Sequence, residues 1–133
     1  MLKAVIDTNI WVSALLKSPL TRPILEAFIK EEFTPILSNE LLQELNDTLN
    51  KPEIARLIKT DEAKELIALI AEKSKRVEPA VMLKIYRDPE DNFILALSKA
   101  SGAPLVTLDK DFLILSEKFN VISPRQFLRR LNK

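Results

Sequence analysis

An α/β fold with a mostly parallel sheet is predicted, because short β-like runs alternate with amphipathic helical patterns along the chain. With 133 residues that are 47% apolar, the chain is long enough to bury a continuous core. We therefore expect a single domain over residues 1–133. Helices should cover both faces of such a sheet, and ligands should gather where its strands end.

The first half of the chain contains clear start and stop signals. The predicted elements there are a strand at 2–6, a helix at 8–16, a helix opened by Thr21-Arg22-Pro23, a strand at 33–37 and a helix in which leucines recur up to Leu49. Thr21 and Ser38 have the residue types preferred at helix N-caps. Pro23 suits an early helical position, and Pro52 ends the third helix.

The second half continues the alternation. The predicted elements there are a helical region split around Thr60-Asp61, a weak strand at 77–81 interrupted by Pro79, a helix opened by Asp88-Pro89, a strand at 105–108, a short strand at 121–122 and a helix opened by Ser123-Pro124. Gly102 is expected just past the end of its helix, because glycine tolerates the left-handed conformation common there.

The composition excludes several kinds of site. The chain has no Cys and no His, so thiolate sites, imidazole bases and His-liganded zinc are absent. Its single Gly rules out glycine-rich phosphate loops. A net charge of +1 shows no basic excess for gripping nucleic acid by phosphate neutralisation alone, although a local basic patch remains compatible with it. Any catalysis must therefore use carboxylates, hydroxyls, Lys or an oxygen-bound metal.

Cellular location is predicted from absences. No apolar run reaches membrane-spanning length, and the first residues do not follow the layout of a signal peptide. The lack of Cys suits a reducing compartment. We therefore expect a cytoplasmic protein with no membrane partner.

Acids occupy the positions where ligands are expected. Asp7 ends the first strand, Asp109 follows the strand at 105–108, and Asp91 lies in the first turn of a helix, while Glu44 lies inside a helix with Glu40 on roughly the same face. Taken singly, each has a simpler interpretation: Asp7 and Asp109 as helix N-caps, Asp91 as a complement to the helix dipole, and the glutamates as surface residues. Their joint placement instead favours one charged site.

Converging carboxylates would repel one another unless a cation joins them. Mg²⁺ or Mn²⁺ suits such a site, because hard cations take oxygen ligands and commonly bridge to phosphate. One or two such ions could activate water for attack on a phosphodiester. That chemistry needs neither His nor Cys.

Four segments together resemble the PIN domain family, and most closely its stand-alone prokaryotic members related to VapC-type toxins. These segments, in family order, are VIDTNIWVSALL, LSNELLQEL, RDPEDNFILALSKASGAPLVTLDKDF and VISPRQFLRRL. The resemblance spans nearly the whole chain and is weakest over residues 50–85. It implies a three-layer α/β/α fold with a central sheet of about five strands, and the activity of a metal-dependent ribonuclease.

The resemblance also assigns roles by position. It implies that Asp7, Glu44, Asp91 and Asp109 are the catalytic acids that hold Mg²⁺ or Mn²⁺, with Glu40 as the competing choice in the loosely aligned helix. Asp111 is a fifth metal-site candidate. Asn9 and Thr107 match supporting polar positions, with a turn residue and an ordinary strand Thr as the alternatives. Among the basic residues, Arg87 and Lys110 are candidates for binding the substrate. The cluster of Arg125, Arg129 and Arg130 is another, although complementing a helix end explains it slightly better.

The implied function is cleavage of RNA by the toxin of a toxin–antitoxin pair. The alternative is a PIN-fold interaction module that binds an antitoxin or an RNA-processing partner and cleaves little. An antitoxin peptide would cover the acidic pocket in either case. A homodimer or higher homo-oligomer is expected, with Trp11, Phe28 and Leu16 as candidate contacts, although core packing is the better interpretation for at least two of them.

Overall fold

The computed structural model describes the backbone of residues 1–79 and 89–132, and the side chains of residues 1–79 and 93–132. The described strands are β1 (Lys3–Ile6), β2 (Thr34–Leu37), β3 (Lys75–Arg76), β4 (Leu105–Val106) and β5 (Val121–Ile122). They form one sheet in the order β3-β2-β1-β4-β5, and every pair is parallel. The predicted α/β class with a central sheet is confirmed, and β1 lies at the centre of that sheet.

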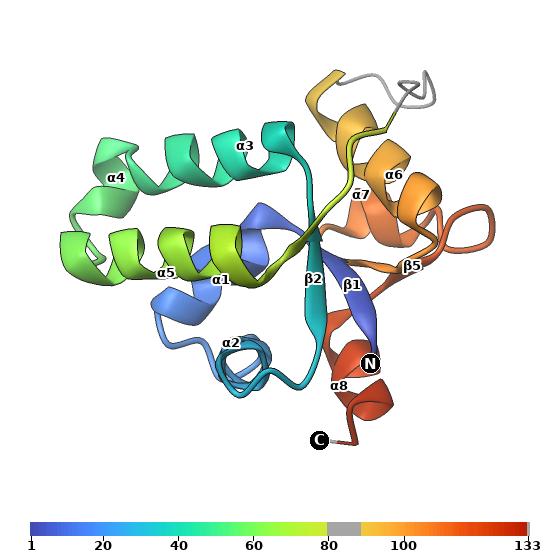
Figure 1. Cartoon of the computed structure of the whole chain (residues 1–133), viewed down its shortest axis with the longest axis horizontal. Coiled ribbons are helices and arrows are strands. Elements are labelled where there is room, and N and C mark those ends of the chain that lie inside the picture. The colour runs from blue at the N-terminus through green and yellow to red at the C-terminus, as the bar shows by residue number, and fades with distance from the viewer. Residues whose placement is uncertain (80–88, 133) are drawn as a thin grey trace.

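Helices cover both faces of this sheet. The helices of the described chain are α1 (Thr8–Leu15), α2 (Arg22–Ile29), α3 (Asn39–Leu49), α4 (Pro52–Ala55), α5 (Thr60–Lys73), α6 (Pro89–Ser101), α7 (Lys110–Leu113) and α8 (Pro124–Arg130). Figure 1 shows α1, α2, α3 and α5 on one side of β1 and β2, with α6 and α7 on the other. The expected three-layer arrangement is therefore present. Within the described ranges, no helix is both long and apolar enough to cross a bilayer.

Local capping explains several helix boundaries. The Ser38 hydroxyl accepts a hydrogen bond from the Leu41 N–H at 3.1 Å, and Ser123 forms a capping box with Gln126. Gly102 follows α6 with φ of +72°, a conformation that costs glycine nothing. Thr21 takes the N-cap position of α2 but makes no capping bond there, and its hydroxyl accepts a hydrogen bond from the Ser13 hydroxyl at 2.8 Å.

The predicted strand at 77–81 is wrong. The strand is β3, two residues earlier, where Ile36 pairs with Lys75 and Leu37 with Arg76. The Val77 N–H still donates a hydrogen bond to the Leu37 carbonyl. Pairing cannot continue past this point, because β2 has ended and Ser38 begins α3. The edge strand is exposed and charged, as edges often are, so apolar residues did not mark it. Residues 80 and 81 of the prediction lie outside the described residues.

The strand predicted at 105–108 is shorter than expected. β4 ends at Val106, and the chain then turns outward so that Leu108 is 39% exposed. The short helix α7, which begins after Asp109, was not predicted. The strand at 121–122 is confirmed.

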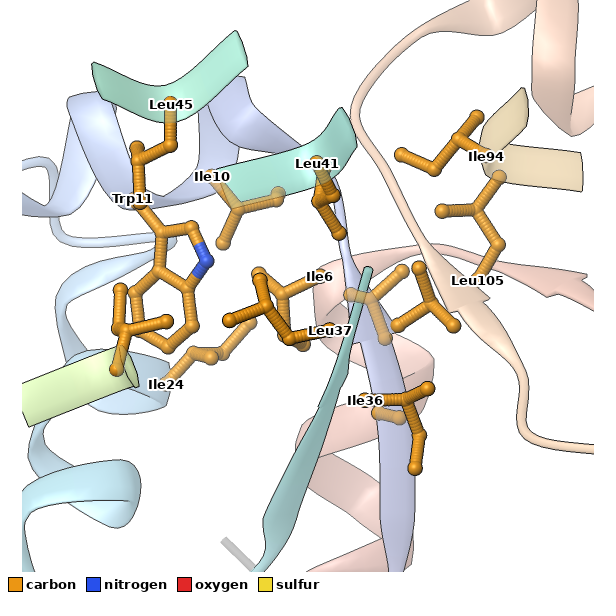
Figure 2. Close-up of a cluster of buried hydrophobic side chains, with 14 of the residues drawn as sticks. Ile6, Ile10, Trp11, Ile24, Ile36, Leu37, Leu41, Leu45, Ile94 and Leu105 are labelled. Carbon is orange, nitrogen blue, oxygen red and sulfur yellow. The ribbon is translucent and has the colours of Figure 1, made fainter. Parts of the chain in front are cut away.

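The core lies between the sheet and the helices. Figure 2 shows Ile6 and Leu37 of the central strands below the helical side chains Ile10 and Leu41, with Leu45 beside Trp11. Trp11 packs edge-on against Phe28, with ring centroids 5.2 Å apart. Trp11 and Phe28 are both buried, so core packing is the correct interpretation for these two, while Leu16 remains 42% exposed.

We predict that Leu45→Ala lowers the free energy of unfolding by about 2–5 kcal/mol, because this side chain is 1% exposed and its loss leaves a cavity. Urea denaturation followed by circular dichroism measures the change. Leu57→Ala is the control, since Leu57 is 67% exposed, and its effect should stay within about 0.5 kcal/mol. Equal effects of the two substitutions would contradict the assigned core.

Candidate active site at the strand ends

Parallel pairing of β1 with β4 brings two distant segments together. Val5 pairs with Leu105 and Ile6 with Val106, so the next residues, Asp7 and Thr107, leave the sheet side by side. The Asp7 N–H donates to the Val106 carbonyl at 3.0 Å, which extends the pairing to the strand end. The sheet therefore places the segments of Asp7 and Asp109 at the same edge, as predicted.

A chain of hydrogen bonds links four of the predicted site residues. The Thr107 hydroxyl donates to Asp7 Oδ2 at 2.7 Å and accepts the Asp109 N–H at 3.0 Å. The Asp111 N–H in turn donates to Asp109 Oδ1 at 2.9 Å. Thr107 is fully buried, so its hydroxyl has a fixed position. Thr107 is thus a residue that orients Asp7, and not an ordinary strand residue.

Asp7 carries its carboxylate in a largely apolar setting, with 7% of the residue exposed. Burial raises the pKa of Asp7 above its ordinary value, and the nearby charge of Asp109 raises it further. The Thr107 hydroxyl and the backbone N–H groups of Thr8 and Asn9 offset part of this rise in pKa. The site therefore holds a carboxylate that would gain from a nearby cation.

The simpler interpretations of Asp7 and Asp109 as helix caps can be judged directly. Asp7 occupies the N-cap position of α1, where the Thr8 and Asn9 N–H groups stabilise its carboxylate without the geometry of a full capping hydrogen bond. Asp109 does cap α7 through its bond from the Asp111 N–H, which leaves its other carboxylate oxygen, Oδ2, outside that bond. Capping explains Asp109 in part, and for Asp7 it leaves the buried bond from Thr107 unexplained.

The remaining predicted residues differ in how far the structure describes and exposes them. Asn9, Lys110 and Asp111 are exposed. In α3, Glu44 is half-buried and Glu40 is exposed. The backbone of Asp91 lies in the first turn of α6, as predicted, but its side chain lies outside the described residues. Arg87 also lies outside them.

The donor chemistry fits a hard cation such as Mg²⁺ or Mn²⁺, because Asp7 and Asp109 offer carboxylate oxygens from neighbouring strand ends. Among the side chains of residues 1–79 and 93–132, however, no three acidic groups lie close enough together to hold a metal ion. A third ligand from the start of α6 would complete the set. We refer to Asp7 and Asp109 as the acid pair.

One polar group at this edge was not singled out from the sequence. The Thr8 hydroxyl is buried and has no hydrogen-bond partner among the described residues. An unsatisfied buried hydroxyl is costly and is often completed by water or a ligand. The position of Thr8 between the site candidates Asp7 and Asn9 could have indicated it from the sequence. A threonine in the first turn of a helix is common, however, so this position alone did not single it out.

We predict that Thr107→Val lowers the free energy of unfolding by about 1–3 kcal/mol, because it removes the buried hydroxyl that joins Asp7 to the Asp109 backbone. Thr107→Ser keeps the hydroxyl and should cost less. Urea denaturation of both variants at neutral pH measures the difference. A valine variant as stable as the serine variant would contradict the role of this hydroxyl.

We also predict a pH-dependent effect of Asp7→Asn in metal-free protein. Because the pKa of Asp7 is raised in the folded state, the folded chain binds that proton more tightly, and stability falls as the pH rises through the folded pKa. The asparagine variant does not lose stability in this way, and its side-chain oxygen can still accept the hydrogen bond from the Thr107 hydroxyl. Its melting temperature in EDTA should exceed that of the unsubstituted protein at neutral pH.

The difference in melting temperature should disappear below the ordinary aspartate pKa of about 4. A series of thermal melts between acidic and neutral pH measures it. A difference that stays constant with pH would show that Asp7 ionisation is not its cause.

Comparison with known proteins supports this arrangement. A family model described as PIN domain matches residues 3–111. The uncharacterized protein MJ1680 of Methanocaldococcus jannaschii is 23% identical over 144 residues, covering 99% of this chain and 93% of its own length.

Three solved structures share the fold. VapBC2 from Rickettsia felis, bound to a DNA fragment from their promoter, aligns with a TM-score of 0.61 and 18% identity over 92% of this chain and 98% of its own. PAE2754 from Pyrobaculum aerophilum aligns with a TM-score of 0.65 and 16% identity, over 98% of this chain and 90% of its own. FitAB bound to an IR36 DNA fragment aligns with a TM-score of 0.56 and 15% identity, over 91% of this chain and 94% of its own. The family match over most of the chain, together with the fold and the strand-end acids, establishes that the chain belongs to the PIN domain family.

Proposed function

We propose that this chain is an Mg²⁺- or Mn²⁺-dependent endoribonuclease and the toxin component of a toxin–antitoxin pair. The observation that carries the proposal is the acid pair at the ends of β1 and β4, with Asp7 buried and held by Thr107. Membership of the PIN domain family supports it, because nuclease activity is general in that family.

The proposed metal ligands are Asp7, Glu44, Asp91 and Asp109, with Asp111 contributing directly or through water. When bound, the divalent ion would activate water and stabilise the charge that develops on the phosphodiester. Thr107 keeps Asp7 in one orientation, and Lys110, exposed beside Asp109, offsets negative charge where a phosphate must approach. Asn9 and Arg87 are proposed as further contacts to ligand water or substrate.

The proposed substrate is single-stranded RNA. Only 7% of Asp7 is exposed, so a phosphodiester must approach the acid pair closely to share a cation with it. A flexible single strand can bend into such a recess, whereas the backbone of a duplex cannot. The target sequence is not part of the proposal.

The proposed protein partner is a cognate antitoxin. The four sequence segments resemble VapC-type toxins, and the fold is similar to that of VapBC2 and of FitAB. A small DNA-binding reading frame beside the gene would support the toxin role, and a solitary gene would favour RNA processing. A cytoplasmic location and self-association into a homodimer remain expectations.

We predict that Asp7→Asn reduces Mn²⁺-dependent cleavage of single-stranded RNA by at least about 100-fold, more than the roughly 10- to 100-fold cost of losing an outer-shell partner. The folded state should survive, because the asparagine side chain can accept the Thr107 hydrogen bond. Asp61→Asn is the matched control, since Asp61 is exposed in α5 and no ligand role is proposed for it. Electrophoresis of a labelled RNA with Mn²⁺ and with EDTA measures cleavage.

The same assay decides between the two helix glutamates. Glu44→Gln should lower cleavage more than Glu40→Gln, because Glu44 is half-buried and Glu40 is exposed. Full activity of Asp7→Asn would defeat the nuclease assignment. Equal inactivity of the unsubstituted protein and the variant would favour the interaction module.

A further inference from the structure

A recess lies at the same edge of the sheet, one strand beyond the acid pair. It has a volume of about 240 Å³ and lies where β4 and β5 end. Its apolar lining consists of Leu20, Leu108, Leu113 and Pro124, and its polar lining of Thr107, Ser123 and Arg125. We call it the strand-end pocket.

The strand-end pocket shares Thr107 with the acid pair, although neither Asp7 nor Asp109 lines it. Thr107 lines the pocket and also donates to Asp7 Oδ2 at 2.7 Å. The Thr107 N–H bonds to the Ile122 carbonyl at 3.1 Å, which fixes Ser123 and Arg125 beside it at the end of β5. A molecule bound at the acid pair therefore has this pocket as its immediate neighbour.

The lining of the pocket combines apolar surface with one available cation. Leu108 is 39% exposed and Leu20 is 36% exposed, both unusually open for leucine beside a charged site. Ser123 is already engaged in its capping box with Gln126. Within the described part of the chain, the Arg125 guanidinium makes no ion pair or hydrogen bond, so it is available to a ligand.

We propose that the strand-end pocket binds the nucleobase next to the scissile phosphate of single-stranded RNA, with Arg125 contacting a flanking phosphate. This inference rests on the proposed ribonuclease function and adds the site that holds the substrate. Arg125 supplies charge complementary to a phosphate, and the leucines supply apolar surface for the face of an unstacked base. The volume is below the roughly 300–1,000 Å³ of pockets for drug-sized ligands, which suits a single base.

Two contributions to binding can be separated, because each has its own chemical group. Leu108 contacts the base only, so its truncation should matter only for RNA that carries bases. Arg125 contacts phosphate, so its replacement should weaken binding whether or not bases are present. These residues position the substrate and take no part in proton or metal chemistry.

The experiment measures binding by fluorescence anisotropy in the Asp7→Asn background with Mg²⁺, so that RNA is not cleaved. The probes are labelled hexamers of adenylate and of uridylate, and a hexamer of abasic ribose phosphate. The variants added are Leu108→Ala with Ile114→Ala as control, and Arg125→Gln with Arg56→Gln as control. Ile114 and Arg56 are exposed and do not line the pocket. Circular dichroism melts verify that each variant folds.

We expect at least one base-bearing hexamer to bind more tightly than the abasic one, and Leu108→Ala to weaken only the base-bearing hexamer by at least about fivefold. Ile114→Ala should leave this difference intact. Arg125→Gln should weaken binding of all hexamers and lower the slope of log affinity against log salt by about one, unlike Arg56→Gln.

The proposal is overturned if the abasic hexamer binds as tightly as the others, or if each variant behaves like its control. Because anisotropy requires no cleavage, this outcome is independent of the nuclease assay. Failure of the nuclease proposal would appear instead as Mn²⁺-dependent cleavage that does not depend on Asp7.

Discussion

The parallel pairing of β1 with β4 is the constraint on which the site depends. It carries Asp7 to the end of a buried central strand and places Thr107 beside it, although 100 residues separate them in the chain. A carboxylate there loses most of its water, and Thr107 supplies its one short side-chain hydrogen bond within the described structure. Burial outweighs this hydrogen bond, so the pKa of Asp7 rises. Burying the ionised Asp7 carboxylate therefore lowers the stability of the fold at the position where the chemistry is proposed.

That cost has consequences for the rest of the sheet edge. Asp109 adds negative charge next to Asp7 while its own carboxylate caps α7, so one residue serves local structure and the acid pair together. A bound cation would relieve the repulsion and stabilise the folded chain in proportion to its affinity. Beyond the acid pair the edge changes character, because the lining of the strand-end pocket is largely apolar with a single arginine. The proposed electrostatic complementarity to RNA would therefore be local, in keeping with a net charge of only +1.

Short-range signals were sufficient for much of the fold. Ser38, Ser123 and Gly102 mark helix ends through hydrogen bonds and dihedral angles that involve only nearby residues. The strand at β3 was misplaced because its position is determined by where β2 stops pairing, a long-range condition that leaves no apolar pattern on an exposed edge. Thr21 likewise has the residue type of a cap, but a hydroxyl from α1 reaches it in the folded chain.

The sequence alone determined which ligands a metal could have, because a chain without Cys and His must place any metal among oxygen ligands. It also determined that Asp7 and Asp109 follow strands. Only the tertiary structure decided that β1 and β4 are neighbours, which is what makes Thr107 the partner of Asp7 and distinguishes the buried carboxylate from an ordinary helix cap. The physical reason is that strand order is set by packing of the whole core, whereas caps and strand ends are set by a few adjacent residues.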